Sequence, residues 1–139
     1  MNILRDQLTG ARVLDLYAGS GALGLEALSR GAASITLVEY GTKALEALRA
    51  NIAQLDVGGQ ANIHRGDSLD FVKRLGPDAY DVVLADPPYG EAIATELVRL
   101  YRHVSFARIL SVEHPGSEKP GGDETRLYGS TALTFCYAP

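Results

Sequence analysis

The stretch Leu14-Asp15-Leu16-Tyr17-Ala18-Gly19-Ser20-Gly21-Ala22-Leu23-Gly24 decides the fold, because an apolar run passes through a glycine-rich turn into a helical pattern. This succession is typical of an α/β protein whose ligand lies beyond the carboxyl ends of parallel strands. Glycine lets the backbone approach a ligand closely, since it has no Cβ. Gly19, Gly21 and Gly24 also match the G-x-G-x-x-G spacing of dinucleotide-binding folds. The glycines alone leave open an adenosyl cofactor, a dinucleotide or a purely structural turn.

The rest of the chain alternates β-branched runs with helical stretches, which indicates an α/β fold with a mostly parallel sheet. Residues 124–128 and 131–137 flank the turn Gly129-Ser130, so we predict an antiparallel hairpin at the C-terminus. The whole pattern predicts a seven-stranded, doubly wound sheet, with residues 1–139 forming a single domain. The other predicted strands are residues 12–17, 34–39, 61–65, 80–85 and 107–113. The predicted helices are residues 23–30, 42–55 and 91–102, with another that Asp67 or Ser68 caps and that ends at residue 75.

The composition limits the possible functions. The net charge of −4 argues against a general nucleic-acid binder, which would carry a basic stripe. No apolar run approaches the ~20 residues that a membrane helix needs, and the N-terminus has no signal pattern. Cys136 is the single cysteine, so no intrachain disulfide forms, and the three histidines lack metal-ligand spacing. We therefore expect a cytoplasmic protein with no metal and no membrane partner. Nothing in the sequence fixes the oligomeric state, and we expect a monomer.

Acidic residues lie at or near the ends of the first three predicted strands. Asp15 lies close to the end of its strand, and a buried carboxylate needs a partner. That partner is either the ammonium of a methionine moiety or the N–H groups of the turn, and the pyrophosphate of a dinucleotide would be repelled. Glu39 is placed to accept hydrogen bonds from ribose hydroxyls, while Asp67 either accepts from an adenine amine or caps a helix. We expect the cofactor S-adenosylmethionine to be bound by Asp15, Tyr17, Gly19, Ser20, Gly21, Glu39, Asp67 and Ser68.

The tetrapeptide Asp86-Pro87-Pro88-Tyr89 follows the fourth predicted strand and is the most specific pattern in the chain. Two prolines hold the backbone extended and remove two N–H donors, and an ionised Asp86 only accepts hydrogen bonds. Such a loop suits an exocyclic amine, whose two hydrogens are accepted by Asp86 and the Pro87 carbonyl. Tyr89 offers a ring on which a flipped-out base stacks, worth about 1–3 kcal/mol. We therefore predict that Asp86, Pro87, Pro88 and Tyr89 are catalytic; a plain strand-to-helix turn is the alternative.

At this point the chain resembles the bacterial 16S rRNA guanine-N2 methyltransferases. The resemblance implies a Rossmann-like class I methyltransferase fold, S-adenosylmethionine as cofactor, and 16S rRNA or the small ribosomal subunit as partner. It alone implies guanine rather than adenine, because Asp-Pro-Pro-Tyr fits either amine. The similar blocks are Val13-Leu14-Asp15-Leu16-Tyr17-Ala18-Gly19-Ser20-Gly21, Leu25-Glu26-Ala27-Leu28-Ser29-Arg30-Gly31-Ala32, Val38-Glu39, residues 81–89 and Tyr128-Gly129-Ser130-Thr131-Ala132-Leu133.

One departure from this family concerns the N-terminus. Its members carry several dozen residues, some of them basic, before the first strand, whereas this sequence begins at Met1-Asn2-Ile3-Leu4, just before that strand. We therefore expect the family's N-terminal segment to be absent here. The alternative functions are a DNA adenine-N6 methyltransferase, which uses the same tetrapeptide, and a non-catalytic cofactor-binding remnant. A dehydrogenase is the weakest alternative.

Overall fold

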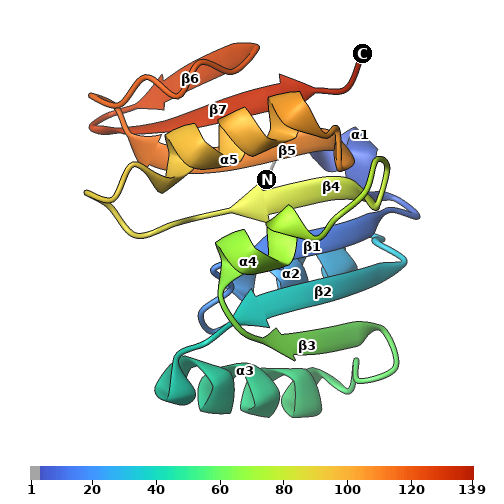
Figure 1. Ribbon diagram of the computed structural model, residues 1–139. Coiled ribbons are helices and arrows are strands. Elements are labelled where there is room, and N and C mark those ends of the chain that lie inside the picture. Colours follow the sequence, from blue (N-terminus) through green and yellow to red (C-terminus); the bar gives the residue numbers. More distant parts are fainter. Residues whose placement is uncertain (1–3) are drawn as a thin grey trace.

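The computed structural model describes residues 4–139, which form a seven-stranded sheet with helices on both faces (Figure 1). The strand order is β3-β2-β1-β4-β5-β7-β6. The helices are α1 (Arg5–Leu8), α2 (Ala22–Ser29), α3 (Thr42–Leu55), α4 (Ser68–Lys73) and α5 (Ile93–His103). The strands are β1 (Arg12–Leu16), β2 (Ser34–Glu39), β3 (Ala61–Arg65), β4 (Tyr80–Ala85), β5 (Ala107–Pro115), β6 (Glu124–Tyr128) and β7 (Thr131–Tyr137).

The sheet has the predicted doubly wound topology. Strands β1 to β5 are parallel, whereas β7 pairs antiparallel with both β5 and β6. The chain runs from β1 outward to β3 and then returns to the other side of β1 with β4, so strand order reverses between β1 and β4. Open α/β sheets bind ligands at such a reversal, outside the carboxyl ends of the strands. The fold class predicted from the sequence is therefore confirmed.

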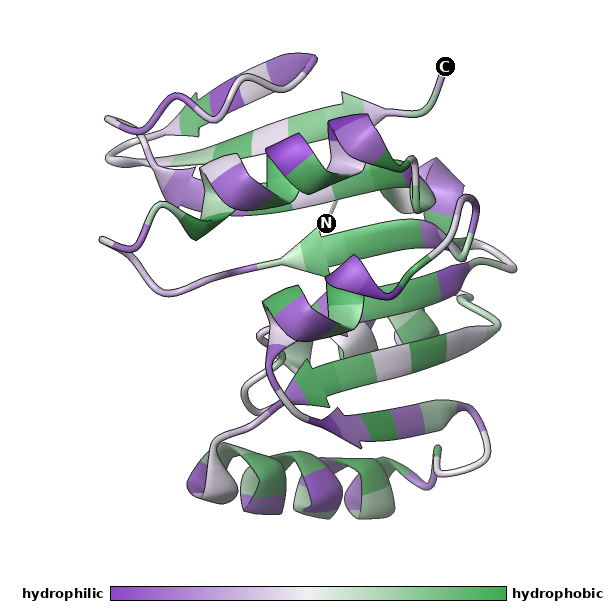
Figure 2. Cartoon of the chain, viewed as in Figure 1, coloured by the Kyte–Doolittle hydropathy of each residue, from purple (hydrophilic) through white to green (hydrophobic). Residues whose placement is uncertain are grey.

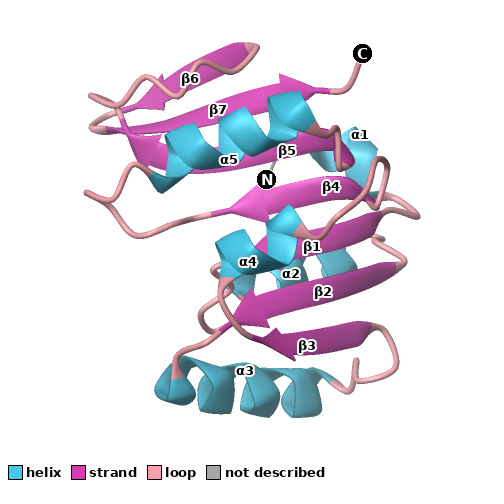
Figure 3. Ribbon diagram, in the orientation of Figure 1, coloured by secondary structure: helices cyan, strands magenta, loops and turns pink. Residues whose placement is uncertain are grey.

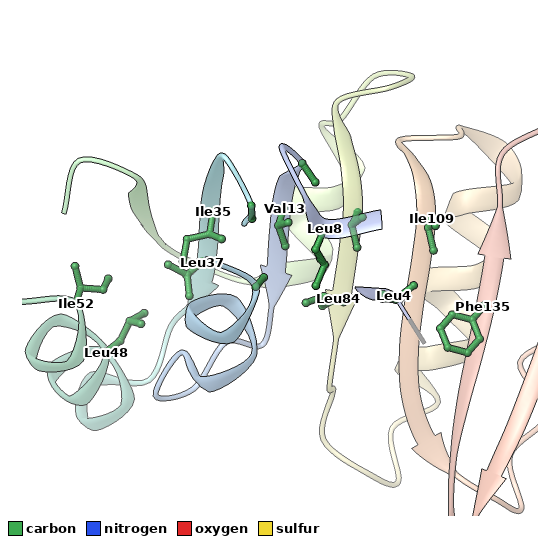
Figure 4. Close-up of a cluster of buried hydrophobic side chains, with 14 of the residues drawn as sticks. Leu4, Leu8, Val13, Ile35, Leu37, Leu48, Ile52, Leu84, Ile109 and Phe135 are labelled. Carbon is green, nitrogen blue, oxygen red and sulfur yellow. The ribbon is translucent and has the colours of Figure 1, made fainter. Parts of the chain in front are cut away.

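Two hydrophobic layers hold the helices on the sheet. Figure 3 distinguishes these helices from the strands that they cover. Alternate residues of β1 point to opposite faces, so Val13 joins one layer while Leu14 and Leu16 join the other. The first layer packs α1, α2 and α3 against the sheet, and Figure 4 shows Leu48 and Ile52 of α3 facing the sheet. The second layer packs α4 and α5. Figure 2 shows the corresponding apolar strands at the centre of the sheet.

Several element ends differ from the prediction, each for a local reason. The strand β1 stops at Leu16 because Tyr17 has a left-handed backbone with φ 57°. The helix α5 begins at Ile93 rather than residue 91 because Ala92 is also left-handed, with φ 53°. The strand β5 extends to Pro115 because it pairs with β7 as far as Thr131. The helix α4 ends at Lys73, before the predicted residue 75. Cys136 is buried in β7.

None of the helices within residues 4–139 has both the length and the apolar character that a bilayer crossing requires.

Candidate active site

A cleft of about 530 Å³ opens at the carboxyl ends of β1, β2 and β4. Its volume falls in the range typical of small-molecule sites, about 300–1,000 Å³. The topology brings its lining residues together, because parallel strands all end at the same edge of the sheet (Figure 1). The lining residues are Tyr17, Glu39, Tyr40, Gly41, Asp67, Leu69, Asp86, Pro88, Glu91 and Ile93.

Glu39 joins the glycine-rich turn to the turn after β2. One carboxylate oxygen, Oε1, accepts the N–H of Gly19 at 2.7 Å. The other, Oε2, accepts the N–H groups of Tyr40 at 3.1 Å and Gly41 at 2.9 Å. Hydrogen bonds to an ionised acceptor are stronger than neutral ones. This single side chain therefore sets the spacing between two backbone segments of the cleft.

Close packing between the glycine-rich turn and its neighbours requires glycine at Gly21. Its φ is +87°, and a Cβ there would collide with the Leu48 side chain of α3. L-residues rarely adopt this φ. Its neighbour Ser20 is exposed, and its carbonyl accepts a hydrogen bond from Asn51 at 2.9 Å. Both residues shape the turn, and neither lines the cleft.

Asp15 lies beneath the cleft with only 1% of its surface exposed. Its Oδ2 accepts the N–H of Gly24 at 2.9 Å. The glycine-rich turn therefore satisfies part of the hydrogen-bonding capacity of this carboxylate, as expected if Asp15 accepts from the N–H groups of the turn. Burial raises the pKa of Asp15 from 3.8 to about 7, and the nearby carboxylates Asp86 and Glu39 add to the rise. A cationic group in the cleft would reverse this effect, since it stabilises the ionised form.

The raised pKa of Asp15 predicts a stability that falls with rising pH. Between pH about 4 and 7 the unfolded chain has an ionised Asp15 while the folded chain keeps it protonated. The protonated Asp15 therefore stabilises the fold fully below pH about 4, and this contribution is lost as pH rises through about 7. The contribution to the free energy of unfolding is at most about 4 kcal/mol. In Asp15→Asn the group no longer titrates and still accepts from Gly24. We expect urea unfolding to show the wild type losing stability from pH 5 to 8 more steeply than the variant.

A matched control for this experiment is Asp56→Asn, since Asp56 is an exposed carboxyl at a left-handed position that asparagine tolerates. This control should keep the wild-type pH dependence. Equal slopes in the wild type and Asp15→Asn would contradict a buried, protonated Asp15.

The start of α4 supports the floor of the cleft. Asp67 caps this helix, because its Oδ2 accepts the N–H of Asp70 at 2.9 Å, while the residue also lines the cleft. Both sequence interpretations of Asp67 thus remain compatible. Ser68 is buried and its Oγ accepts the N–H of Tyr17 at 3.0 Å, which holds the left-handed turn at Tyr17. The Tyr17 hydroxyl is buried without a hydrogen-bond partner in the described part of the chain.

The Asp-Pro-Pro-Tyr loop separates the cleft from a narrow hollow on its other side. Asp86 and Pro88 line the cleft. Pro87, Pro88 and Tyr89 line the narrow hollow. The Tyr89 ring is 53% exposed, and its hydroxyl lies 3.2 Å from Thr131 Oγ1 at the start of β7. The structure therefore brings Asp86 to the cleft and turns Tyr89 away from it.

Sequence reasoning missed six residues near the site. Five of them line the cleft, and each lies within a few positions of a residue that was predicted: Tyr40, Gly41, Leu69, Glu91 and Ile93. The sixth, Glu113, ends the predicted strand at residues 107–113 and borders the narrow hollow. Its position at a strand end was the available signal, since acidic residues at other strand ends were noticed for that reason.

A family model described as Conserved hypothetical protein 95 matches residues 1–121. The chain belongs to this family. Among curated relatives, a Ribosomal RNA small subunit methyltransferase D from Buchnera aphidicola is 33% identical over 116 residues, or 84% of this chain and 60% of the relative. The Escherichia coli protein of the same name is 37% identical over 99 residues, or 71% of this chain and 49% of the relative. The resemblance found in the sequence is therefore confirmed.

Solved structures similar to this member of the Conserved hypothetical protein 95 family share its whole architecture. One, titled "Putative methyltransferase yhhF from Escherichia coli", has a TM-score of 0.82 and 30% sequence identity, and covers 96% of this chain and 78% of that one. The chain spans about half to 60% of the length of the curated relatives quoted above.

Proposed function

We propose that this chain is an S-adenosylmethionine-dependent methyltransferase that transfers a methyl group to the exocyclic N2 amine of a guanine in 16S rRNA. The observation that carries the proposal is the position of Asp86, which lines the acidic cleft and belongs to the loop that borders the neighbouring hollow. A methyl donor on one side and an amine acceptor on the other would meet at this carboxylate. The names of the curated relatives support small-subunit rRNA as the substrate.

The charge of the cleft suits the cofactor. Glu39, Asp67, Asp86 and Glu91 line it, Asp15 lies beneath it, and none of its lining residues is lysine or arginine. S-adenosylmethionine carries a sulfonium and an ammonium against one carboxylate, so an acidic pocket attracts it. The pyrophosphate of a dinucleotide would be repelled, which disfavours a dehydrogenase. The unpartnered Tyr17 hydroxyl and the cleft volume of about 530 Å³ are also consistent with a ligand of this size and polarity.

Individual residues would hold different parts of this cofactor. Glu39 ends β2 and would accept from ribose hydroxyls, while Asp67 would accept from the adenine amine. Asp15, below the glycine-rich turn, would face the ammonium directly or through water. Gly19 would give the backbone close access to the methionine moiety. When bound, S-adenosylmethionine supplies an electrophilic methyl group whose leaving group is a neutral thioether.

The acceptor loop would prepare the amine. Asp86 and the Pro87 carbonyl accept its two hydrogens, so the nitrogen becomes more tetrahedral and its lone pair becomes available. Alignment and preorganised electrostatics then supply most of the rate gain. Tyr89, half exposed at the narrow hollow, is placed for a base that arrives from the side opposite the cofactor. Asp86 or water takes the proton that the nitrogen loses after transfer.

Tritium transfer from labelled S-adenosylmethionine tests the proposal. The substrate is small ribosomal subunits from a strain that lacks the modification, and the protein is expressed from its complete reading frame. We expect label in N2-methylguanosine after nuclease digestion. Subunits from the parent strain, whose target guanine is already methylated, should take up much less label. Duplex DNA is offered in parallel, and label in N6-methyladenine would favour the DNA methyltransferase alternative. No label on any acceptor, with cofactor binding intact by calorimetry, would favour the non-catalytic alternative.

A further inference from the structure

A second carboxyl group, Glu113, lies beside Asp86 at the acceptor side of the site. Ala85 of β4 is the register partner of Val112 of β5. The next residues, Asp86 after β4 and Glu113 on β5, therefore lie side by side. Their side chains share a face, because Leu84 and Ser111, two residues earlier, are also register partners. Neighbouring strands lie about 4.8 Å apart, which brings the two carboxyl groups within mutual reach.

Glu113 also lies beside the acceptor loop. It borders the narrow hollow together with Pro87 and Tyr89. It further borders a separate cavity of about 110 Å³, whose other lining residues include Leu84, Ser111 and Leu133. Glu113 is therefore the carboxylate that faces the tetrapeptide from β5, on the side away from the cofactor cleft.

The two carboxyl groups influence each other. Partial burial and the negative charge of the neighbouring Asp86 raise the pKa of Glu113. The other titratable groups at the narrow hollow already have partners: His114 contacts Thr134 Oγ1 at 2.6 Å, and Glu118 accepts from Thr95. Among the described side chains at the hollow, Glu113 is thus the carboxylate left to accept from a base, and Asp86 lies beside it at the cleft.

The hydrogen-bonding edge of guanine matches two adjacent carboxylates. Its N2 amine and its N1–H are neighbouring donors, so one carboxylate accepts from each. Adenine has an N1 lone pair beside its N6 amine, and that lone pair faces an ionised carboxylate unfavourably. We propose that Glu113 accepts the N1–H of the target base while Asp86 accepts from the amine, and that Glu113 thereby selects guanine. This inference rests on the proposed methyltransferase function.

Glu113 is thus a specificity-determining residue. On binding, guanine donates its N1–H to the ionised Glu113, and a proton that Glu113 carries in the free protein leaves to solvent. A base with an acceptor at N1 makes no such replacement, and leaves an ionised Glu113 facing a lone pair. Sites that hydrogen-bond an N–H group discriminate strongly against analogues without it, because their own polar groups are then left unpaired.

The test uses 2-aminopurine, which keeps the N2 amine but has no hydrogen at N1. Small subunits are reconstituted from 16S rRNA that carries guanine or 2-aminopurine at the target position, and initial rates are measured at pH 8, above the ordinary range of carboxyl pKa values. We expect the wild type to prefer guanine by about 100-fold in kcat/KM or more. In Glu113→Gln the amide also donates a hydrogen bond, so the preference should fall below about 10-fold.

The matched control is Glu96→Gln, which removes an exposed carboxylate on α5 that pairs with Arg99. It should keep the wild-type preference. If Glu113→Gln is active and keeps the full preference for guanine, or if the wild type methylates both bases equally, Glu113 does not select the base and the proposed methyltransferase function still stands. Should Glu113→Gln fold poorly, Glu113→Asp serves instead, since its shorter carboxylate should lower the rate on guanine more than the rate on 2-aminopurine. Absence of transfer to either base by the wild type would instead overturn the proposed function.

Discussion

Replacing Asp86 with alanine is expected to lower the rate of methyl transfer about 100- to 1,000-fold, the range found when one preorganised electrostatic group is removed. Asp86 is the carboxylate that both lines the cofactor cleft and begins the acceptor loop. Its loss leaves the amine with the Pro87 carbonyl as its one acceptor in the loop. The measurement is kcat/KM for tritium transfer to small subunits that lack the modification.

Binding of S-adenosylhomocysteine separates this effect from damage to the cleft. Calorimetry should give Asp86→Ala an affinity within about threefold of the wild type, or a higher one, because a nearby charge is removed from Asp15. The exposed-site variant Asp56→Asn should be fully active. A variant Asp86→Ala that retains more than a tenth of the wild-type rate would remove this residue from the chemistry.

Replacing Glu39 with alanine is expected to weaken S-adenosylhomocysteine binding about 100-fold and to lower the free energy of unfolding by about 2 kcal/mol. Three backbone N–H groups, at Gly19, Tyr40 and Gly41, lose their shared acceptor. Part of each loss is recovered through water, so the stability cost stays below the sum of three unsatisfied donors. The binding loss is larger because the turn loses its spacing and the ribose loses its acceptor.

The conservative variant Glu39→Gln divides these two contributions. Its amide oxygen still accepts from one of the two turns, while its NH₂ group faces N–H donors on the other. We expect Glu39→Gln to bind S-adenosylhomocysteine about tenfold more weakly than the wild type. Its free energy of unfolding should equal or exceed that of Glu39→Ala. Urea unfolding gives the stability and calorimetry the affinity. Wild-type affinity in Glu39→Ala would show that the turn holds its shape without this carboxylate.

The strand ends were predictable because an acidic residue after an apolar run is a local pattern. Asp15, Glu39 and Asp86 could each be placed at the same sheet edge from the sequence, since parallel strands end together. The cap role of Asp67 was likewise visible from the helical pattern that follows it. Local rules of this kind gave the order of the elements and most of their bounds, with β1, β5, α2, α4 and α5 differing by one or two residues at one or both ends.

Other parts of the site depend on contacts that no local pattern contains. The proximity of Asp86 and Glu113 requires β4 and β5 to be neighbours in register, and the two residues are far apart in the chain. The bridge from Glu39 to Gly19 likewise depends on how two turns approach. The direction of Tyr89 follows from its contact with Thr131 of β7, which belongs to the C-terminal hairpin.

The reversal of strand order between β1 and β4 also separates two proposed roles along the sequence. The residues proposed to bind the ammonium, ribose and adenine of the methyl donor are Asp15, Glu39 and Asp67, and all precede β4, whereas Asp86 and Glu113, proposed to bind the acceptor base, follow it. Recombination at the segment between α4 and β4 would therefore exchange the proposed acceptor residues while keeping these donor contacts. Such chimeras offer a route by which relatives of this chain could come to methylate other nucleobases while they keep the same cofactor contacts.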